Sequence, residues 1–287
     1  TRAQAIALAI VLAIYLALGL RLLTLLPLWG PVLDEPIYFG YAKYVAVTGK
    51  LPRIHPTPPG TPLTAYYTLP SAGDAGHHPP GYFLLGAGLL RLLGDVPLAT
   101  QNYALRGLSL ALGLGSLVLL FFAVRRLVPE SRWLPLGVTA VVAFFPEWLL
   151  VSSVIYLESY GGLTASATLL ALAAYMRGKG GLGAVAIAGA CTGLLALTKY
   201  TVLPFCLAAG LSVLAIAWRR RQGLRHVLIH VAVFTLVALA VGGWWYARNV
   251  MLYDRLFPTT DQMLGTTALT RVVMRDGSTD MIAMLFI

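Results

Sequence analysis

Charged residues are scarce in this sequence, since only 32 of its 287 residues are Lys, Arg, Asp or Glu. This share of 11% is far below the roughly 25% that soluble domains carry. So few charges cannot cover the surface of a water-soluble globule of this length, which excludes a soluble domain. With 58% hydrophobic residues and a mean hydropathy of +0.78, the chain is expected to be solvated by the lipid bilayer.

Cysteine is also rare, and the alternating pattern of barrel strands is missing. Cys191 and Cys206 both fall inside apolar segments, so we expect buried thiols rather than a disulfide. The apolar runs are continuous and rich in Leu and Ala, which favours membrane-spanning helices over a barrel. The net charge of +10 comes from basic residues in short loops, not from a basic face with aromatics, so nucleic acid is not an expected partner.

The apolar runs predict an all-α, polytopic membrane protein with about seven transmembrane helices. Most runs come close to the roughly 20 residues that cross a bilayer. The expected spans are residues 3–28, 101–124, 133–155, 159–176, 182–198, 201–218 and 226–247. The chain begins at Thr1, and residues 281–287 resemble the start of a further span. We therefore expect residues 1–287 to form one transmembrane module of a longer protein.

Basic residues beside short loops indicate the orientation, because such loops stay on the cytoplasmic side. An inside amino terminus brings all three basic clusters inside, at residues 125–132, 177–179 and 219–225. The inner side then holds ten basic residues and one acid, and eleven basic and ten acidic residues remain outside or in the membrane. Because the acids gather outside, we expect the functional site on the extracytoplasmic side of the cell membrane.

This topology leaves a long first outer loop, residues 29–100, and a last outer loop, residues 251–280. Apolar residues at helical spacing predict an amphipathic helix over Pro36–Thr48. The apolar run 81–93 is too short to span comfortably, so we expect a helix in the outer interface, with Arg91 reaching toward the head groups. Six prolines between these helices predict an extended course: Pro52, Pro56, Pro58, Pro59, Pro62 and Pro70.

Two adjacent acids, Asp34 and Glu35, follow the first span at the outer surface. Negative charge at the start of a helix is favourable to the helix dipole, which would explain both residues without any chemistry. A partly desolvated carboxylate at this level could instead act as general base on an acceptor hydroxyl. Binding of a divalent cation through oxygen ligands is a third interpretation.

Cationic and imidazole side chains from other segments fall at the same depth. His77 and His78 precede two prolines, which predicts a stiff turn. The two imidazoles could form hydrogen bonds with a phosphate, or the segment could be only a polar turn. Lys199 lies between two apolar runs, where a lysine is costly unless it reaches the head groups or serves a function. Arg248 follows an aromatic belt at the outer end of the last span. Further charged residues at or near this level are Arg21, Arg106, Glu147 and Glu158.

Together these residues suit a lipid-linked phosphate, because cations would hold the phosphate while its polyprenyl tail stays in the bilayer. A carboxylate would activate the attacking oxygen. His226 and His230, spaced four residues apart near the inner end of the last span, could bind a metal or a porphyrin-type ring. No Glu follows the first histidine as in zinc proteases, so an interfacial role is favoured.

Several of these segments occur in an order that resembles a known superfamily. They are Asp34-Glu35, a Tyr-containing helix with Gly49-Lys50-Leu51-Pro52, His78-Pro79-Pro80-Gly81-Tyr82-Phe83, Ala104-Leu105-Arg106, Leu197-Thr198-Lys199-Tyr200 and Trp245-Tyr246-Ala247-Arg248-Asn249. The order resembles the GT-C membrane glycosyltransferases, in the branch of dolichyl-phosphate-mannose protein mannosyltransferases and aminoarabinose lipid A transferases. Seven spans with a long first outer loop are similar to the shared amino-terminal module of that family, whose variable carboxy-terminal half is missing here.

The resemblance implies transfer of a sugar from a polyprenyl-phosphate carrier to an extracytoplasmic acceptor of unknown kind, with inversion at the anomeric carbon. It makes Asp34 the general base, with Glu35 beside it orienting acceptor or donor. His78 stands where the lipid A transferases have a lysine before two prolines, so it would contact the donor phosphate with Lys199 and Arg248. Supporting residues would be His77, Arg106 and Glu158. No cofactor is required, although a divalent cation at the outer carboxylates is compatible with this chemistry.

Two other classes of function are compatible with the composition. A non-catalytic membrane subunit of a larger assembly could keep the transferase fold for its interactions alone. A transporter would place polar groups near the bilayer midplane and often break its helices. Most charges of this chain lie at the rim instead, which favours the transferase.

Overall fold

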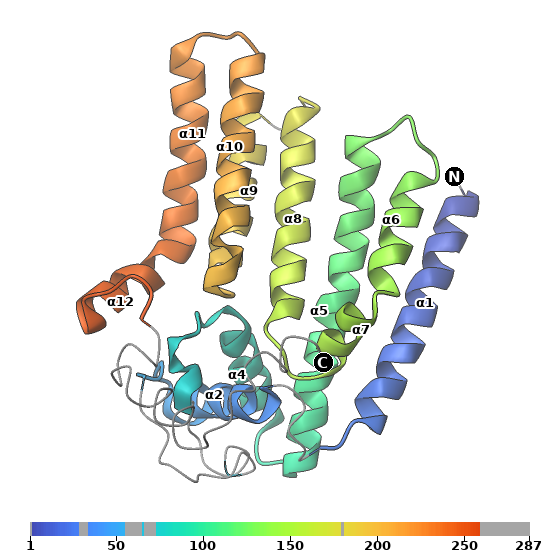
Figure 1. Ribbon diagram of the computed structural model, residues 1–287, viewed down its shortest axis with the longest axis vertical. Coiled ribbons are helices and arrows are strands. Elements are labelled where there is room, and N and C mark those ends of the chain that lie inside the picture. Colours follow the sequence, from blue (N-terminus) through green and yellow to red (C-terminus); the bar gives the residue numbers. More distant parts are fainter. Residues whose placement is uncertain (1, 29–33, 55–64, 66–72, 179–180, 259–287) are drawn as a thin grey trace, which may run out of the picture.

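The computed structural model of the protein describes residues 2–28, 34–54, 65, 73–178 and 181–258. Within these residues all regular secondary structure is helical. Figure 1 shows an upright bundle with shorter helices at one end. The bundle contains α1 (Arg2–Leu25), α5 (Leu98–Leu127), α6 (Leu134–Ala143), α8 (Glu158–Met176), α9 (Gly181–Ala196), α10 (Leu203–Arg219) and α11 (Leu224–Ala238).

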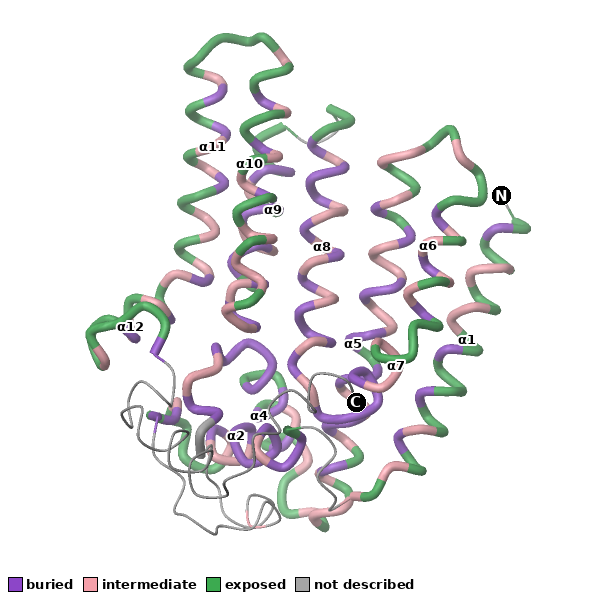
Figure 2. The backbone as a smooth tube through the Cα atoms, viewed as in Figure 1, coloured by how far each residue is buried: buried purple, intermediate pink, exposed green. Residues whose placement is uncertain are grey.

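Four of the described helices are long and apolar enough to cross a membrane. They are α1, α5, the helix Tyr200–Arg219, which joins the 3-10 turn η2 (Tyr200–Val202) to α10, and the helix Leu224–Tyr253, which includes α11. Long apolar side chains are exposed along α1 and α11, whereas α8 is buried between α5 and α9 (Figure 2). These helices identify a helical, membrane-embedded protein.

The segment 133–155 differs from the single span predicted for it. Two helices occupy it, α6 and α7 (Pro146–Ser153), which meet at an angle of 61°. Pro146 cannot donate a backbone hydrogen bond, and it forces the preceding Phe145 into an extended conformation, with φ −69° and ψ 119°. The proline therefore ends α6 and starts α7 in a new direction, which places Glu147 at the first turn of α7.

The last described span also ends differently from the prediction. After α11 the helix widens into a π-helical turn, Leu239–Gly243, and continues as α12 (Trp244–Tyr253). Figure 1 shows α12 turned away from the axis of α11. The helix therefore runs beyond residue 247, and the predicted outer loop 251–280 begins only after Tyr253. Residues 259–280 of that loop and the expected span at 281–287 lie outside the described residues.

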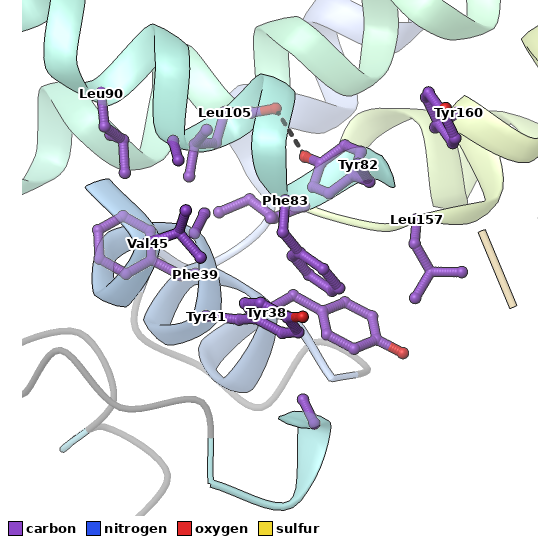
Figure 3. Close-up of a cluster of buried hydrophobic side chains, with 14 of the residues drawn as sticks. Tyr38, Phe39, Tyr41, Val45, Tyr82, Phe83, Leu90, Leu105, Leu157 and Tyr160 are labelled. Carbon is purple, nitrogen blue, oxygen red and sulfur yellow. Dashed lines mark hydrogen bonds between the residues drawn. The ribbon is translucent and has the colours of Figure 1, made fainter. Parts of the chain in front are cut away.

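Three short elements at the lower end of the bundle share an aromatic core: α2 (Glu35–Thr48), the 3-10 turn η1 (Gly73–His77) and α4 (Gly81–Leu93). One face of α2 packs on α4, where the Tyr41 and Phe83 rings stack with centroids 3.9 Å apart (Figure 3). Tyr82 of α4 donates from its hydroxyl to the carbonyl of Leu105 on α5 at 3.3 Å. This core fixes α2 and α4 against the bundle.

Arg91 was predicted to reach toward the head groups, but in the structure its side chain binds the end of α2 instead. Its Nε donates to the carbonyl of Ala46 at 2.8 Å, and its Nη2 donates to that of Val45 at 3.1 Å. The last carbonyls of a helix have no intrahelical partners, and a cation is favourable there. Because α2 ends at Gly49 in the left-handed conformation (φ 69°), Arg91 reaches these carbonyls and ties α4 to the end of α2.

The prolines Pro56, Pro58, Pro59, Pro62 and Pro70, predicted to follow an extended course, lie outside the described residues. The described residues of the predicted basic clusters lie at the opposite end of the bundle from α2 and α4. At that end α5, α8 and α10 end and α6, α9 and α11 begin, beside the start of α1 (Figure 1). There Arg177 donates to the carbonyls of Arg126 and Leu127 at the end of α5. The two ends of the bundle therefore differ in charge.

Candidate functional site

Glu35 and Arg106 form a fully buried ion pair between α2 and α5. The Nε of Arg106 donates to Glu35 Oε1 at 2.6 Å, and its Nη2 donates to Oε2 at 2.7 Å. Its remaining N–H groups donate to carbonyls at the end of α1, at 2.8 to 3.0 Å: Leu23, Leu26 and Pro27. Glu35 also accepts the Ile155 amide at 3.2 Å. All five guanidinium donors are used, so the pair is saturated.

Asp34 lies next to Glu35 in the chain, but its side chain is exposed at the start of α2. The carboxylate makes no capping hydrogen bond to α2, and it accepts instead from the Tyr38 hydroxyl at 3.3 Å. The Tyr38 and Tyr156 ring centroids lie 5.3 Å apart. Burial raises the pKa of Tyr156 to about 12, and three carboxylates add to the rise: Glu158, Asp34 and Glu147. The carboxylates from α2, α7 and α8 therefore share one neighbourhood.

The His77–His78 turn is packed against α2. The His78 ring meets the Tyr38 ring edge-on, with centroids 5.5 Å apart, and the His78 carbonyl accepts the Tyr41 hydroxyl at 3.3 Å. Burial lowers the pKa of His78 to about 3, and the charges of His77 and Lys199 add to the drop. The imidazole is therefore neutral at physiological pH. It would meet a phosphate as a hydrogen-bond donor rather than as a cation.

Lys199 lies on the link between α9 and η2 and pairs with Glu158 at the start of α8. Its Nζ donates to Glu158 Oε1 at 2.9 Å, and the two side chains are 31% and 32% exposed. Glu158 Oε2 has no hydrogen-bond partner among the described residues. The backbone N–H of Gly81 donates to the Leu197 carbonyl at 2.8 Å. This bond joins the Lys199 link to the start of α4, directly after the histidine turn.

A groove of about 730 Å³ opens beside the Lys199–Glu158 pair. It follows one face of α8 from Glu158 through Gly161 to Ala165, so it runs from the charged pair along the helix. Its charged lining residues within the described chain are Glu147, Glu158 and Lys199. Apolar side chains form most of the wall: Phe145, Trp148, Leu150, Val151, Leu157, Leu195, Val202 and Phe205. The shape and lining suit a hydrocarbon chain with a charged head.

Arg248 approaches from α12 on the far side of Tyr41. Its Nη2 donates to the Pro52 carbonyl at 2.8 Å, and its guanidinium lies 4.7 Å from the centre of the Trp245 ring. Burial raises the pKa of Tyr41, and the positive charge of Arg248 opposes that rise. The Nη1 of Arg248 has no hydrogen-bond partner among the described residues. This Nη1 is buried, so one donor of the cation is unsatisfied within the described residues.

The predicted site residues separate into two groups. Three of them lie near Tyr38 of α2: Asp34, His78 and Lys199. Arg248 lies near Tyr41 of the same helix. His77 and Glu158 belong to the same region, since the His77 carbonyl accepts the Tyr200 hydroxyl at 2.7 Å, next to Lys199 in the chain. Glu35 and Arg106 instead form the saturated pair behind α2.

Sequence analysis missed Tyr156. Tyr156 lies on the short link between α7 and α8, where no helical period marks it. An aromatic residue two positions before an acid was the only available signal.

A divalent cation at the outer carboxylates stays a prediction that the described residues do not test. No three His, Cys, Asp or Glu side chains there lie close enough to hold a metal ion.

At the other end of the bundle, His230 Nδ1 contacts the His226 carbonyl at 2.8 Å, and the two rings lie 3.8 Å apart. His230 also stacks on Tyr175 at 5.6 Å, so this histidine pair packs between helices.

Comparison of the chain with protein-family models, curated proteins and solved structures finds no match. The site must therefore be interpreted from its own geometry.

Proposed function

We propose that this protein is a membrane glycosyltransferase of the GT-C type, which transfers a sugar from a polyprenyl-phosphate carrier to an extracytoplasmic acceptor. The groove beside the Lys199–Glu158 pair carries the proposal. It combines a long apolar wall with a charged end near Asp34 and His78. Such a groove suits a lipid carrier, because the isoprenoid chain would follow α8 while the phosphate and sugar stay at the charged end.

Three side chains serve as ligands of the donor phosphate. Lys199 supplies a positive charge at the mouth of the groove. The neutral His78 donates a hydrogen bond, and Arg248 on α12 supplies a second positive charge. Hydrogen bonds to a charged phosphate are stronger than those between neutral groups. The set therefore favours a phosphate over a neutral head group.

Asp34 is the general base of the proposed reaction. The acceptor hydroxyl gives its proton to the Asp34 carboxylate while its oxygen forms a bond to the anomeric carbon. The bond between that carbon and the phosphate oxygen breaks, and the phosphate leaves with the electron pair. Because polyprenyl phosphate is already a stable anion, no acid is needed on the leaving side. Asp34 is exposed rather than partly desolvated as predicted, and no cation pairs with it among the described residues, so its carboxylate is accessible to an acceptor hydroxyl.

Glu35 takes a positioning role in this proposal rather than contacting the substrate. Both its oxygens are bound by Arg106, and Oε1 also accepts the Ile155 amide. These bonds hold the first turn of α2 against α5 and against the link before α8. Asp34 precedes that turn directly, so the saturated pair fixes where the general base stands.

The number of spans and their sidedness are also part of the proposal. Besides the four long helices, α6, α8 and α9 stand upright in the bundle (Figure 1). With α6–α7 counted as one bent crossing, the proposal has seven crossings. The end with the arginine-rich connections would be cytoplasmic under the rule for basic loops. The groove and Asp34 would then face the outside of the cell membrane.

The variant Asp34→Asn tests the assignment. Loss of a general base costs roughly 10²- to 10⁴-fold in rate. Membranes that contain the protein are supplied with polyprenyl-phosphate-linked sugars, and the release of polyprenyl phosphate is measured. Asp34→Asn should reduce release by about this factor and leave thermal unfolding unchanged.

Asp95→Asn is the matched control, because Asp95 is an exposed carboxylate at the same end of the bundle, beyond α4. It should keep full activity. Normal release in Asp34→Asn would refute the role of Asp34, and absence of release in the unaltered protein with every carrier-linked sugar would refute the transferase.

A further inference from the structure

The Lys199–Glu158 pair differs from a simple phosphate ligand, because Lys199 already has a partner. Its ammonium contacts Glu158 Oε1 at 2.9 Å on the wall of the groove. Among the described residues that line the groove, Lys199 is the only cation, beside two carboxylates, Glu147 and Glu158. An incoming phosphate therefore meets a neutral ion pair and must compete with Glu158 for Lys199.

The pair is arranged so that Lys199 can change partner. Both side chains remain about one-third exposed, and the bond to Glu158 is the only hydrogen bond of the Lys199 ammonium among the described residues. Partly exposed ion pairs contribute little to stability, so separating them is not costly. The fully buried Glu35–Arg106 pair, in contrast, has no open donor and could not exchange.

Donor and product of the proposed reaction differ in charge. The donor is a phosphodiester and carries one negative charge, whereas the released polyprenyl phosphate is a monoester with a charge of about −1.5 to −2. A lone lysine attracts the more highly charged ion more strongly. It would hold the product more tightly than the donor, and the enzyme would be inhibited by its own product.

We propose that Glu158 is the residue that expels the polyprenyl phosphate product, by competing with it for Lys199. The carboxylate attracts Lys199 back and repels the product more than the donor, since repulsion grows with charge. The pair as a whole has no net charge, so it does not favour the more highly charged polyprenyl phosphate over the donor as a lone lysine would. This inference rests on the proposed function and makes Glu158 a specificity residue of the same site.

The test compares Glu158→Gln with Glu147→Gln. Binding of polyprenyl phosphate to the purified protein in nanodiscs is measured directly, and donor KM, kcat and product inhibition are measured in turnover. Glu158→Gln should tighten product binding on the order of tenfold, with a smaller decrease in donor KM. Its kcat should fall, because product release becomes slow.

Glu147→Gln removes the same charge from the same groove wall but frees no cation. It should tighten product binding clearly less than Glu158→Gln. In the double variant Glu158→Gln/Lys199→Gln the tightening should disappear, because the freed lysine is gone. This double variant separates release of Lys199 from a general loss of negative charge.

The outcomes distinguish the two proposals. If the unaltered protein binds no polyprenyl phosphate, the donor class and the role of Glu158 both fail. If it binds, but Glu158→Gln brings no tightening, or Glu147→Gln tightens equally, only the role of Glu158 is overturned. Should Glu158→Gln not fold, Glu158→Asp takes its place, because the shorter side chain withdraws from Lys199. It should then tighten product binding by a smaller factor, and no tightening would overturn the inference.

Discussion

Two carboxylate–cation pairs with opposite properties lie within this protein. Glu35–Arg106 is 0% exposed, bidentate and bound to three further carbonyls and an amide. Glu158–Lys199 is joined by one bond, is one-third exposed and faces a groove. The chemistry of the charged groups is similar in both. The two pairs differ in how many hydrogen-bonding positions of their charged groups are still free to bind a ligand.

The two ion pairs show that burial decides whether a charged pair supports the fold or can bind a ligand. An ion that is removed from water must find all its partners within the protein, and such a pair then serves structure. A pair that keeps water on one side can open for a ligand at little cost.

The largest effect on stability is expected at Arg106. Arg106→Ala leaves the buried Glu35 carboxylate without a cation and three carbonyls without donors, which should cost about 3–5 kcal/mol. Thermal unfolding in detergent should show this loss. The corresponding variant of the exposed pair, Lys199→Ala, should cost no more than about 1 kcal/mol. Equal losses in the two variants would contradict the distinction between the pairs.

An effect on binding rather than stability is expected at Lys199. Lys199→Gln removes a charge-assisted bond to the donor phosphate, so donor KM should rise about tenfold or more. Lys43→Gln serves as the control, because Lys43 lies on α2 with its charge 5.7 Å from the centre of the Phe39 ring, outside the groove lining. A rise in KM for Lys43→Gln as large as that for Lys199→Gln would show that the lysine effect is not specific to the groove.

The smallest effect is expected from His78, which belongs to neither pair and packs against Tyr38. Its pKa is about 3 in the folded protein and about 6.5 in an unfolded chain. Below pH 6.5 the unfolded chain therefore binds a proton that the folded protein does not, so His78 lowers stability as the pH falls toward 3. Melting temperatures between pH 7.5 and 4.5 should fall less steeply in His78→Gln than in the unaltered protein. Parallel curves would mean that His78 is already charged in the fold.

Sequence patterns predicted most helices of this fold, because apolar runs and helical spacing are local properties. The helix over Pro36–Thr48 corresponds to α2, and the run 81–93 corresponds to α4. The bend at Pro146 was missed although the proline is visible in the sequence. The apolar run continues across Pro146, so hydrophobicity predicts one helix, but the proline does not allow the backbone to continue as a straight helix.

Pairings between distant segments could not be predicted. Arg106 and Glu35 are 71 residues apart, and nothing near either residue indicates that the two would bind each other. Arg91 likewise binds carbonyls of α2 about 45 residues earlier, which depends on how α4 packs. That Asp34, His78 and Lys199 lie in one region could be anticipated from the predicted spans, but their partners could not.

The contact between Gly81 and Leu197 sets one dimension of the site. A Cβ atom at position 81 would lie only 2.7 Å from the Leu197 carbonyl oxygen, so no other residue fits without moving one backbone away from the other. Because the bond joins two main chains, changes of side chain elsewhere on α4 or α9 leave it intact. The spacing between the start of α4 and the Lys199 link is thus a property of two backbones, so the side chains around it can change one by one while that spacing stays constant.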